Sequence, residues 1–415
     1  MAPSAEPNTA GDRAPGERGV VCVAAGSRGR ASSALVGPRA RRRTRVAVVP
    51  MDNMPGMPRI LASAWWLFGS TVLAGVVLRR WFGDELVVTR YTGYVMPWLL
   101  LGLLPGAVWA WVKQRRVLAA ILGASAATII AVHAPLFRSH PPFSPPGAVL
   151  LRVMSYNTWS KNADATRIAR VILHDRPDVL LLQEIPADVL ARLTDALRDL
   201  YGGSAIHVTY DAELLQGIVS RYSIEPSTSF VDKGNAQTAV IRSPGGPITV
   251  FNVHPLRAGG WRDRYSQITA LLEEDVLPAA GPVILGGDFN APDRSQLYGM
   301  VSSALANAHE ERGAGFGFTY PAYIASRLGA IAAVPLVRID HIFFTDHFVA
   351  VRAGTIDDSG GSDHRPVFAD LALVAAVGRS TNAAADLRPG TARDDGQRAA
   401  KHRAGEANPV AERRH

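Results

Sequence analysis

The chain has 415 residues, of which 47% are apolar and 19% are charged, and it contains one cysteine. A single cysteine excludes a scaffold held by disulfides, and the length allows two or three domains. The formal net charge of +8 indicates nucleic-acid binding only if the basic residues lie on the functional domain. Residues 149–375 carry 19 basic and 25 acidic side chains, a net charge of −6, so the positive excess lies elsewhere.

Three apolar segments without charged residues follow the first 58 residues. They span 60–78, 91–112 and 117–137, which are 19, 22 and 21 residues long. Because about 20 apolar residues cross a bilayer as a helix, we predict three transmembrane helices within residues 59–138. The alternatives are a buried soluble hairpin and a cleaved signal peptide, and the three lengths disfavour both.

Lysine and arginine residues predict how these helices are oriented. Arginines precede the first helix, and Lys113, Arg115 and Arg116 fill the loop between the second and the third. Basic loops favour the cytoplasmic side, although Arg79 and Arg80 in the first loop weaken the bias. We therefore expect a multi-pass cell-membrane protein with a cytoplasmic amino terminus and an extracytoplasmic domain from residue 138 onward.

The segments that flank the helices and the large domain lack apolar periodicity. Residues 1–58 and 376–415 are rich in alanine and arginine and are predicted to be disordered. Residues 139–148 contain four prolines, which predicts a stiff spacer. Within the amino-terminal arm and at its end, Met51, Met54 and Met57 are alternative starts to Met1.

Residues 149–375 alternate short runs of Val, Ile and Leu with amphipathic segments, which is typical of an α/β domain. The expected strands are 150–155, 178–183, 218–220, 239–242, 249–253, 283–286, 341–344 and 367–371. The expected helices are 163–174, 186–200 and 263–277.

Polar residues recur where these strands begin or end. Taken alone, each is more typical of a turn residue, a cap or a structural histidine. Ligands of α/β sheets gather beyond strand ends, however, so the recurrence predicts one convergent site. The set comprises Asn157, Glu184, His254, Asp288, Asn290, Asp340, Asp363 and His364.

These residues lie in six ordered motifs between about residues 150 and 373. The motifs are Ser-Tyr-Asn, Leu-Leu-Gln-Glu, Val-Phe-Asn-Val-His, Gly-Asp-Phe-Asn, Ile-Asp-His and Ser-Asp-His-Arg-Pro. In this order they resemble the endonuclease/exonuclease/phosphatase superfamily of metal-dependent phosphoesterases. The resemblance implies a four-layer α/β sandwich, with two packed mixed sheets flanked by helices and one active site at one end of the sheets.

The expected metal is Mg²⁺, with Mn²⁺ as the alternative, because these ions prefer oxygen ligands and the sequence has no cysteine and histidine cluster with zinc spacing. Glu184 is the expected ligand, and the resemblance places Asn157 and Asp363 beside the ion.

The resemblance also implies the catalytic roles. His364 would orient or deprotonate the attacking water, and Asp340 would hold its other ring nitrogen. Asp288 would align the nucleophile, while Asn290 and His254 would donate to phosphoryl oxygens.

Arg221 follows a predicted strand and has two interpretations. It either pairs with the substrate phosphate or is a solvated surface arginine.

The net charge of −6 argues against DNA, because DNA enzymes use basic surfaces to neutralise phosphates. A tethered domain instead favours a lipid phosphate or pyrophosphate in the bilayer. The layout resembles membrane-anchored family members linked to glycopeptide resistance, which makes undecaprenyl pyrophosphate the candidate substrate. The alternatives are an extracytoplasmic nuclease or other phosphodiesterase, and a catalytically silent binding module. The sequence indicates no protein partner.

Overall fold

A computed structural model describes residues 57–138, 143, 145–162, 164–200, 206–255, 260–326 and 329–374. The predicted disordered tail and almost all of the amino-terminal arm lie outside these residues, as does half of the proline-rich spacer.

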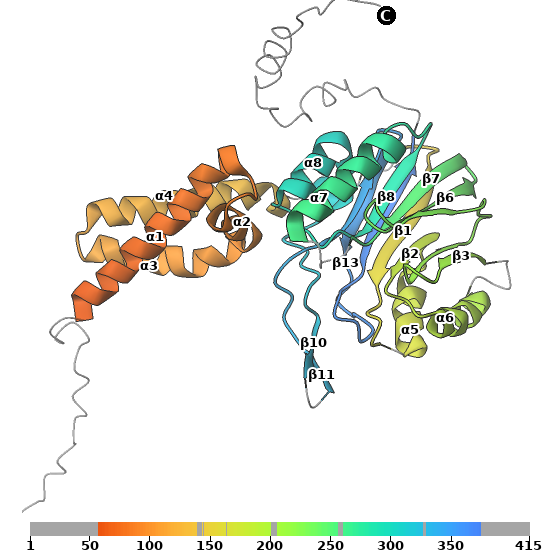
Figure 1. Cartoon of the computed structure of the whole chain (residues 1–415), viewed down its shortest axis with the longest axis horizontal. Helices are drawn as coiled ribbons and strands as arrows, with labels where there is room; N and C mark the ends of the chain where they lie inside the picture. Colours follow the sequence, from red (N-terminus) through yellow and green to blue (C-terminus); the bar gives the residue numbers. More distant parts are fainter. Residues whose placement is uncertain are drawn as a thin grey trace, which may run out of the picture. The chain divides into compact units, whose positions relative to one another are not determined.

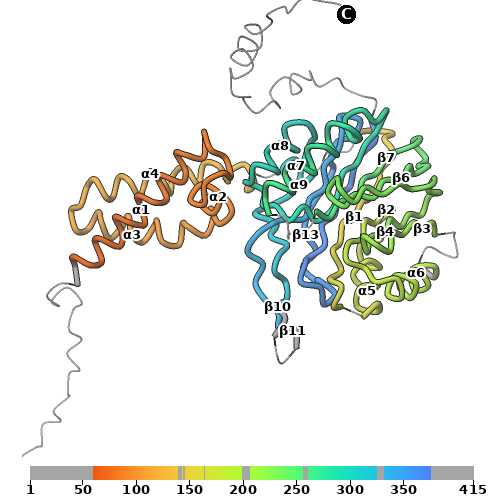
Figure 2. The backbone as a smooth tube through the Cα atoms, in the orientation of Figure 1, coloured from red at the N-terminus to blue at the C-terminus, as the bar shows by residue number. Residues whose placement is uncertain are grey.

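The apolar segments form helices that lie side by side (Figures 1 and 2). Leu103, Leu118 and Leu122 form part of their shared core. Two stretches, Arg59–Phe82 and Arg116–Phe137, are long and apolar enough to span a membrane. The helical elements are α1 (Met57–Phe82), α2 (Val87–Tyr94), η2 (Met96–Leu99), α3 (Leu100–Val112), α4 (Arg116–His133) and η3 (Ala134–Phe137).

The second predicted span is not one straight helix. Val87–Tyr94 and Met96–Val112 are bent by 88° relative to each other. Val95 leaves the helical conformation at the bend, with φ −108° and ψ 19°. Pro97 lacks an amide proton and fits only the first turn of a helix, so a new helix begins beside it. A third membrane crossing therefore requires the bent pair to cross as one unit.

Two six-stranded sheets follow, and both are mixed. The first has the order β13-β14-β1-β2-β4-β3, and the second has the order β5-β6-β7-β8-β12-β9. The first contains β1 (Val149–Asn157), β2 (Val179–Gln183), β3 (His207–Asp211), β4 (Gln216–Ser220), β13 (Phe348–Thr355) and β14 (Val367–Leu373). The second contains β5 (Thr228–Phe230), β6 (Ala236–Ser243), β7 (Gly246–Val253), β8 (Val283–Asp288), β9 (Ala306–Asn307) and β12 (Asp340–Phe344).

One apolar core lies between the two sheets, and helices cover their outer faces. Leu181 and Ile218 of the first sheet pack in the same buried cluster as Val250 and Ile284 of the second. This arrangement confirms the prediction of two mixed sheets flanked by helices (Figure 1). The covering helices are α5 (Ala165–Asp175) and α6 (Ala187–Leu200) on the first sheet, and α7 (Gly260–Leu271), a π-helical turn (Leu272–Val276) and α8 (Gln296–Ala304) on the second.

Several elements were not predicted. They are β3, β5, β9, β13, α8, the short helix α9 (Ala308–Arg312) and a separate hairpin formed by β10 (Tyr323–Ser326) and β11 (Gly329–Ala332).

The strand directions explain why the predicted polar residues meet. Each sheet has one parallel pair at its centre, β1 with β2 and β7 with β8, and all four of these strands lead into predicted site residues. Strand β12 runs antiparallel to β8, so it begins at Asp340 opposite Asp288. Strand β14 runs antiparallel to β1, so Val367 lies opposite Ser155 and the loop before it reaches the same edge.

Gly287 lies where the backbones of β7 and β8 approach each other closely at this edge. Its φ is +149°, and a Cβ atom there would lie 2.0 Å from the Val253 carbonyl oxygen. We expect Gly287→Ala to lower the free energy of unfolding by ~3 kcal/mol or more, because both backbone conformation and pairing are lost. Thermal unfolding in detergent, followed by circular dichroism, measures the change.

Gly299 in α8 is the matched control, because a Cβ atom there meets nothing within 4 Å. Gly299→Ala should stabilise the helix by about 0.5–1 kcal/mol. Equal changes in the free energy of unfolding for Gly287→Ala and Gly299→Ala would contradict a special requirement for glycine at position 287.

Candidate active site

Asp288 lies at the centre of the cluster and is fully buried. Its Oδ2 accepts a hydrogen bond from Asn157 Nδ2 at 3.1 Å, and its Oδ1 accepts one from the Asn290 amide at 2.8 Å. The Nε2 atoms of His254 and His364 both lie 3.6 Å from Oδ2. Burial raises the pKa of Asp288, but the charges of the two histidines outweigh it and the pKa is lowered. The carboxylate is therefore ionised although it is buried.

Glu184 follows β2 in a left-handed conformation, with φ 51°, and its side chain is partly exposed. Its Oε1 accepts from Asn157 Nδ2 at 3.2 Å and lies 3.6 Å from His254 Nε2. Its Oε2 accepts from the amide and hydroxyl of Ser160 at 3.2 and 3.1 Å. Burial raises the pKa of Glu184, but these donors and His254 outweigh it, so the pKa is lowered. Glu184 is thus a charged carboxylate that solvent reaches.

His364 and Asp340 form a buried pair. His364 Nδ1 lies 2.9 Å from Asp340 Oδ2, and both side chains are at most 2% exposed. Burial lowers the pKa of His364, but Asp340 and Asp288 outweigh it and raise the pKa to about 10. Burial and Asp288 also raise the pKa of Asp340, so the pair favours its protonated form. While His364 holds that proton it can orient a water molecule, whereas deprotonating the water requires it first to lose the proton.

The structure places the remaining predicted residues as follows. Asn290 lies beside Asp288, and its Nδ2 donates to the Pro255 carbonyl at 3.1 Å. Asp363 precedes His364, and its charge contributes to the raised pKa of that histidine. The cluster therefore contains Asn157, Glu184, His254, Asp288, Asn290, Asp340, Asp363 and His364.

Arg221 lies outside this cluster. Its Nη1 is 2.8 Å from Asp178 Oδ1, and Asp178 directly precedes β2, whereas Glu184 directly follows it. Because β4 runs antiparallel to β2, the residue after β4 lies at the start of β2, about 17 Å from its end. The expectation that Arg221 contacts phosphate at this site is therefore wrong, and the surface interpretation holds.

Sequence reasoning missed residues that position the cluster. The Ser362 hydroxyl donates to the Asn157 carbonyl at 2.7 Å and accepts from the His364 amide at 3.0 Å. Ser160 holds Glu184, and the Tyr320 ring lies 4.9 Å from the His364 ring. Ser362 is the first residue of the Ser-Asp-His-Arg-Pro motif, so the motif could have indicated that it lies at the site. Nothing in the sequence pattern indicated Ser160 or Tyr320.

The donor set of the cluster fits a divalent cation that prefers oxygen ligands. Asn157 Nδ2 donates to the carboxylates of both Glu184 and Asp288, so two anionic groups converge on this side chain. Asp288, Asp340 and His364 also offer three ligand atoms within 4.8 Å of one another, but Asp340 and His364 already bond to each other. Carboxylate and amide oxygens match the preference of Mg²⁺ and Mn²⁺.

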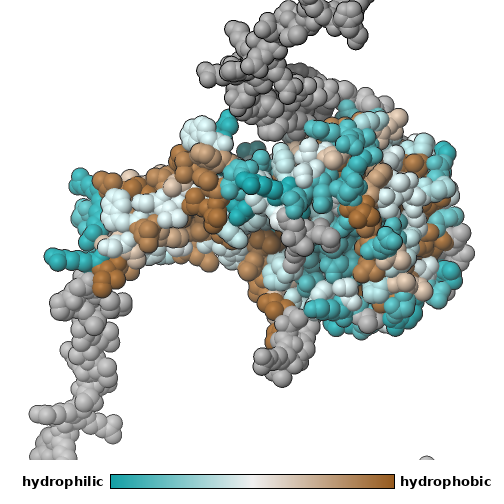
Figure 3. All heavy atoms as spheres, in the orientation of Figure 1, coloured by the Kyte–Doolittle hydropathy of each residue, from teal (hydrophilic) through white to brown (hydrophobic). Residues whose placement is uncertain are grey.

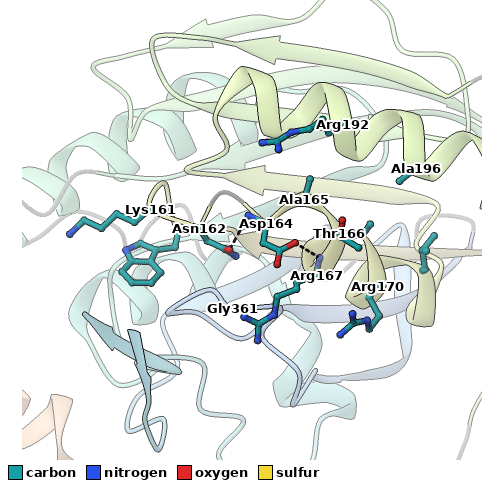
Figure 4. Close-up of a pocket in the computed structure, with 13 residues that line it drawn as sticks. Lys161, Asn162, Asp164, Ala165, Thr166, Arg167, Arg170, Arg192, Ala196 and Gly361 are labelled. Carbon is teal, nitrogen blue, oxygen red and sulfur yellow. Dashed lines mark hydrogen bonds between the residues drawn. The ribbon is translucent and has the colours of Figure 1, made fainter. Parts of the chain in front are cut away.

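A basic cavity of about 910 Å³ is lined by α5, by α6 and by the loop that follows β1 (Figure 4). The amide of Trp159, on its wall, donates to Asn157 Oδ1 at 3.0 Å, which connects the cavity to the site. Exposed cationic side chains from α5, α6 and the preceding loop line it, with Asp164 as the acidic residue among them. The cavity can therefore attract an anionic group. The cationic residues are Lys161, Arg167, Arg170 and Arg192.

Residues 154–364, half of the chain, match the sequence model of the Endonuclease/Exonuclease/phosphatase family. The chain belongs to this family. Its members are phosphoric ester hydrolases that typically depend on divalent metal ions, so this chain is such a hydrolase.

Solved structures similar to the chain share low sequence identity with it. A family member from Bacteroides thetaiotaomicron is 20% identical over 55% of this chain and 99% of its own, with a TM-score of 0.45. TDP2 from D. rerio, complexed with a single-strand DNA product, is 18% identical over 54% and 98%, with a TM-score of 0.44. A mannosyl-6-phosphatase from B. thetaiotaomicron is 20% identical over 53% and 99%, with a TM-score of 0.42. No curated protein matches the chain.

Substitution of His364 tests whether this cluster is catalytic. We expect His364→Gln to lower kcat by about 10²–10⁴-fold, because the proton-carrying ring nitrogen beside Asp288 is removed. Steady-state hydrolysis of a phosphoester by the purified protein measures this loss, and circular dichroism checks that the variant is folded.

His174→Gln is the matched control, because the His174 side chain is 84% exposed and lies outside the cluster. Wild-type kcat in His364→Gln would remove His364 from the mechanism.

Proposed function

We propose that this protein is a membrane-anchored phosphoesterase that hydrolyses a lipid phosphate or pyrophosphate, with undecaprenyl pyrophosphate as the candidate substrate. The observation that carries the proposal is the presence, in one chain, of this cluster of acids and histidines and of two apolar helices of membrane-spanning length. A domain that is tethered in this way meets lipid head groups at far higher concentration than it meets soluble substrates.

Each residue of the cluster has a part in the proposed reaction, in which water attacks phosphorus and the bond to the leaving oxygen breaks. Glu184, with Asn157 and Asp363 beside it, would hold Mg²⁺, or Mn²⁺ in its place. When bound, the ion withdraws electron density from the phosphoryl group and offsets its developing negative charge. The site residues then need only to place the water and the phosphoryl oxygens correctly.

Asp288 aligns the attacking water, because its buried carboxylate is held in one orientation by Asn157 and by the Asn290 amide. His364 contacts the same region through Nε2, and Asp340 fixes its ring through Nδ1. The side chains of His254 and Asn290 donate to phosphoryl oxygens as negative charge develops.

The orientation of the domain is part of the proposal. If the bent pair α2–α3 crosses with α1 and α4, a cytoplasmic amino terminus places the catalytic domain outside the cytoplasm. A periplasmic-active or cytoplasmic-active reporter fused to the carboxyl terminus distinguishes the two sides. Activity of the cytoplasmic reporter would overturn the extracytoplasmic location.

Phosphate release from undecaprenyl pyrophosphate in detergent tests the substrate. We expect Mg²⁺-dependent release that EDTA abolishes, and at least a hundredfold loss in Glu184→Gln, because the proposed metal ligand loses its charge. Glu213→Gln is the matched control, since Glu213 is exposed in the β3–β4 turn. Absence of release from the lipid, with turnover of DNA instead, would overturn the lipid assignment.

The basic cavity favours a second candidate function, a nuclease or another phosphodiesterase. Cationic side chains next to the Trp159 ring are the combination that binds the backbone and bases of single-stranded nucleic acid. The same assay separates the candidates when it is run on single-stranded DNA. Turnover that falls in the double variant Arg167→Gln/Arg170→Gln would support the nuclease, and its absence in the wild type would exclude it.

A further inference from the structure

The hairpin β10–β11 and the segment after it expose apolar side chains. The two strands of the hairpin pair only with each other and belong to neither six-stranded sheet. Ile324 and Ile331 are cross-strand neighbours with relative exposures of 54% and 55%. Val334 and Leu336, in the segment after β11, are 73% and 44% exposed. The part of the hairpin drawn in colour in Figure 3 is apolar. An isolated hairpin is marginally stable in water, and a contiguous apolar surface marks an interaction site.

The base of this hairpin is bonded to the catalytic loop. The Ala322 amide donates to the Asp363 carbonyl at 2.7 Å, and the Arg365 amide donates to the Thr319 carbonyl at 2.9 Å. Both bonds flank His364, whose ring also contacts the ring of Tyr320. A ligand on the apolar strands would therefore lie on an extension of the active site.

The composition of the hairpin indicates which ligand it contacts. Residues 316–336 contain one charged side chain, Arg327, so the surface cannot neutralise nucleic-acid phosphates. Trp98, at the bend between α2 and α3, donates to the Leu336 carbonyl at 2.7 Å and stacks on Phe318 with ring centroids 5.5 Å apart. The hairpin is thus continuous with the apolar helices. Indole rings with one polar and one apolar side are typical of membrane interfaces.

We propose that the described part of this hairpin, residues 320–326 and 329–337, lies in the lipid layer and contacts hydrocarbon chains beside the active site. In this position it holds the tail of a lipid substrate while the phosphate enters the cluster. The substrate part of the proposal rests on the lipid phosphatase function, whereas the contact with hydrocarbon does not.

Fluorescence quenching in proteoliposomes tests the contact directly. The background is the full chain with Cys22→Ser, which removes the one native cysteine. A fluorophore that is attached at Ile331→Cys should be quenched by lipids that carry a spin label on their acyl chains. The matched control is Ala212→Cys, which is exposed in the β3–β4 turn and should not be quenched. Equal quenching at the two positions would overturn the proposal.

An activity ratio tests the role of the hairpin in catalysis. The substrates are undecaprenyl pyrophosphate in vesicles and a short-chain, water-soluble analogue that carries the same head group. We expect the double variant Ile324→Asp/Ile331→Asp to lower the ratio of vesicle to soluble kcat/KM by about tenfold or more, because charges resist immersion in hydrocarbon. Val208→Asp is the matched control, since Val208 is an exposed apolar residue on β3.

The two experiments separate failure of this inference from failure of the proposed function. Wild-type protein that hydrolyses neither substrate would refute the lipid phosphatase, while quenching at residue 331 would still support the hydrocarbon contact. Hydrolysis of the vesicle lipid with an unchanged ratio in the hairpin variant would refute only the hairpin's role in catalysis.

Discussion

The burial of an ionised carboxylate at Asp288 is the constraint on which the catalytic domain depends. An isolated charge in a protein interior is prohibitively costly unless donors and opposite charges surround it. Those groups come from both sheets, with Asn157 from the first and the Asn290 amide from the second, and from the loop that carries His364. The two sheets must therefore meet in one register. One contact between the sheets is a buried hydrogen bond, in which Gln183 Nε2 donates to Asn252 Oδ1 at 2.6 Å.

Much of the site was predictable because it lies where strands end. Asn157 and Asp288 end central strands and Glu184 follows one, and within each sheet the strand direction brings such positions to one edge. Which residues pair was not predictable, because the pairing depends on the stacking of one sheet on the other. Arg221 shows the same limit: without the direction of β4, a polar residue after a strand has an equal chance of lying at either edge. The bend at Val95 was not predictable, because the length of an apolar segment does not indicate whether its helix axis is straight.

The net charge of the catalytic domain did not predict the charge of the surface around the site. The domain carries −6, yet Lys161, Arg167, Arg170 and Arg192 gather at one cavity. In sequence the three arginines occupy the polar faces of amphipathic helices, where solvated cations are ordinary, and Lys161 lies in the loop before α5. Only the packing of α5 beside α6 brings the two faces together, and the loop after Asn157 then connects the cavity with the cluster. Overall charge thus weighs against long nucleic acids without excluding a local anion site.

The charges within the cluster connect proton binding to cation binding. Asp288 and Asp340 face the His364 ring, and the nearby Asp363 adds a further acid. Glu184 lies on the other side of Asn157 and pairs with His254. The acids that surround His364 are what raise its pKa to about 10, since burial alone would lower it. Positive charge added near Glu184 and Asp288 opposes that effect and favours release of the proton from His364.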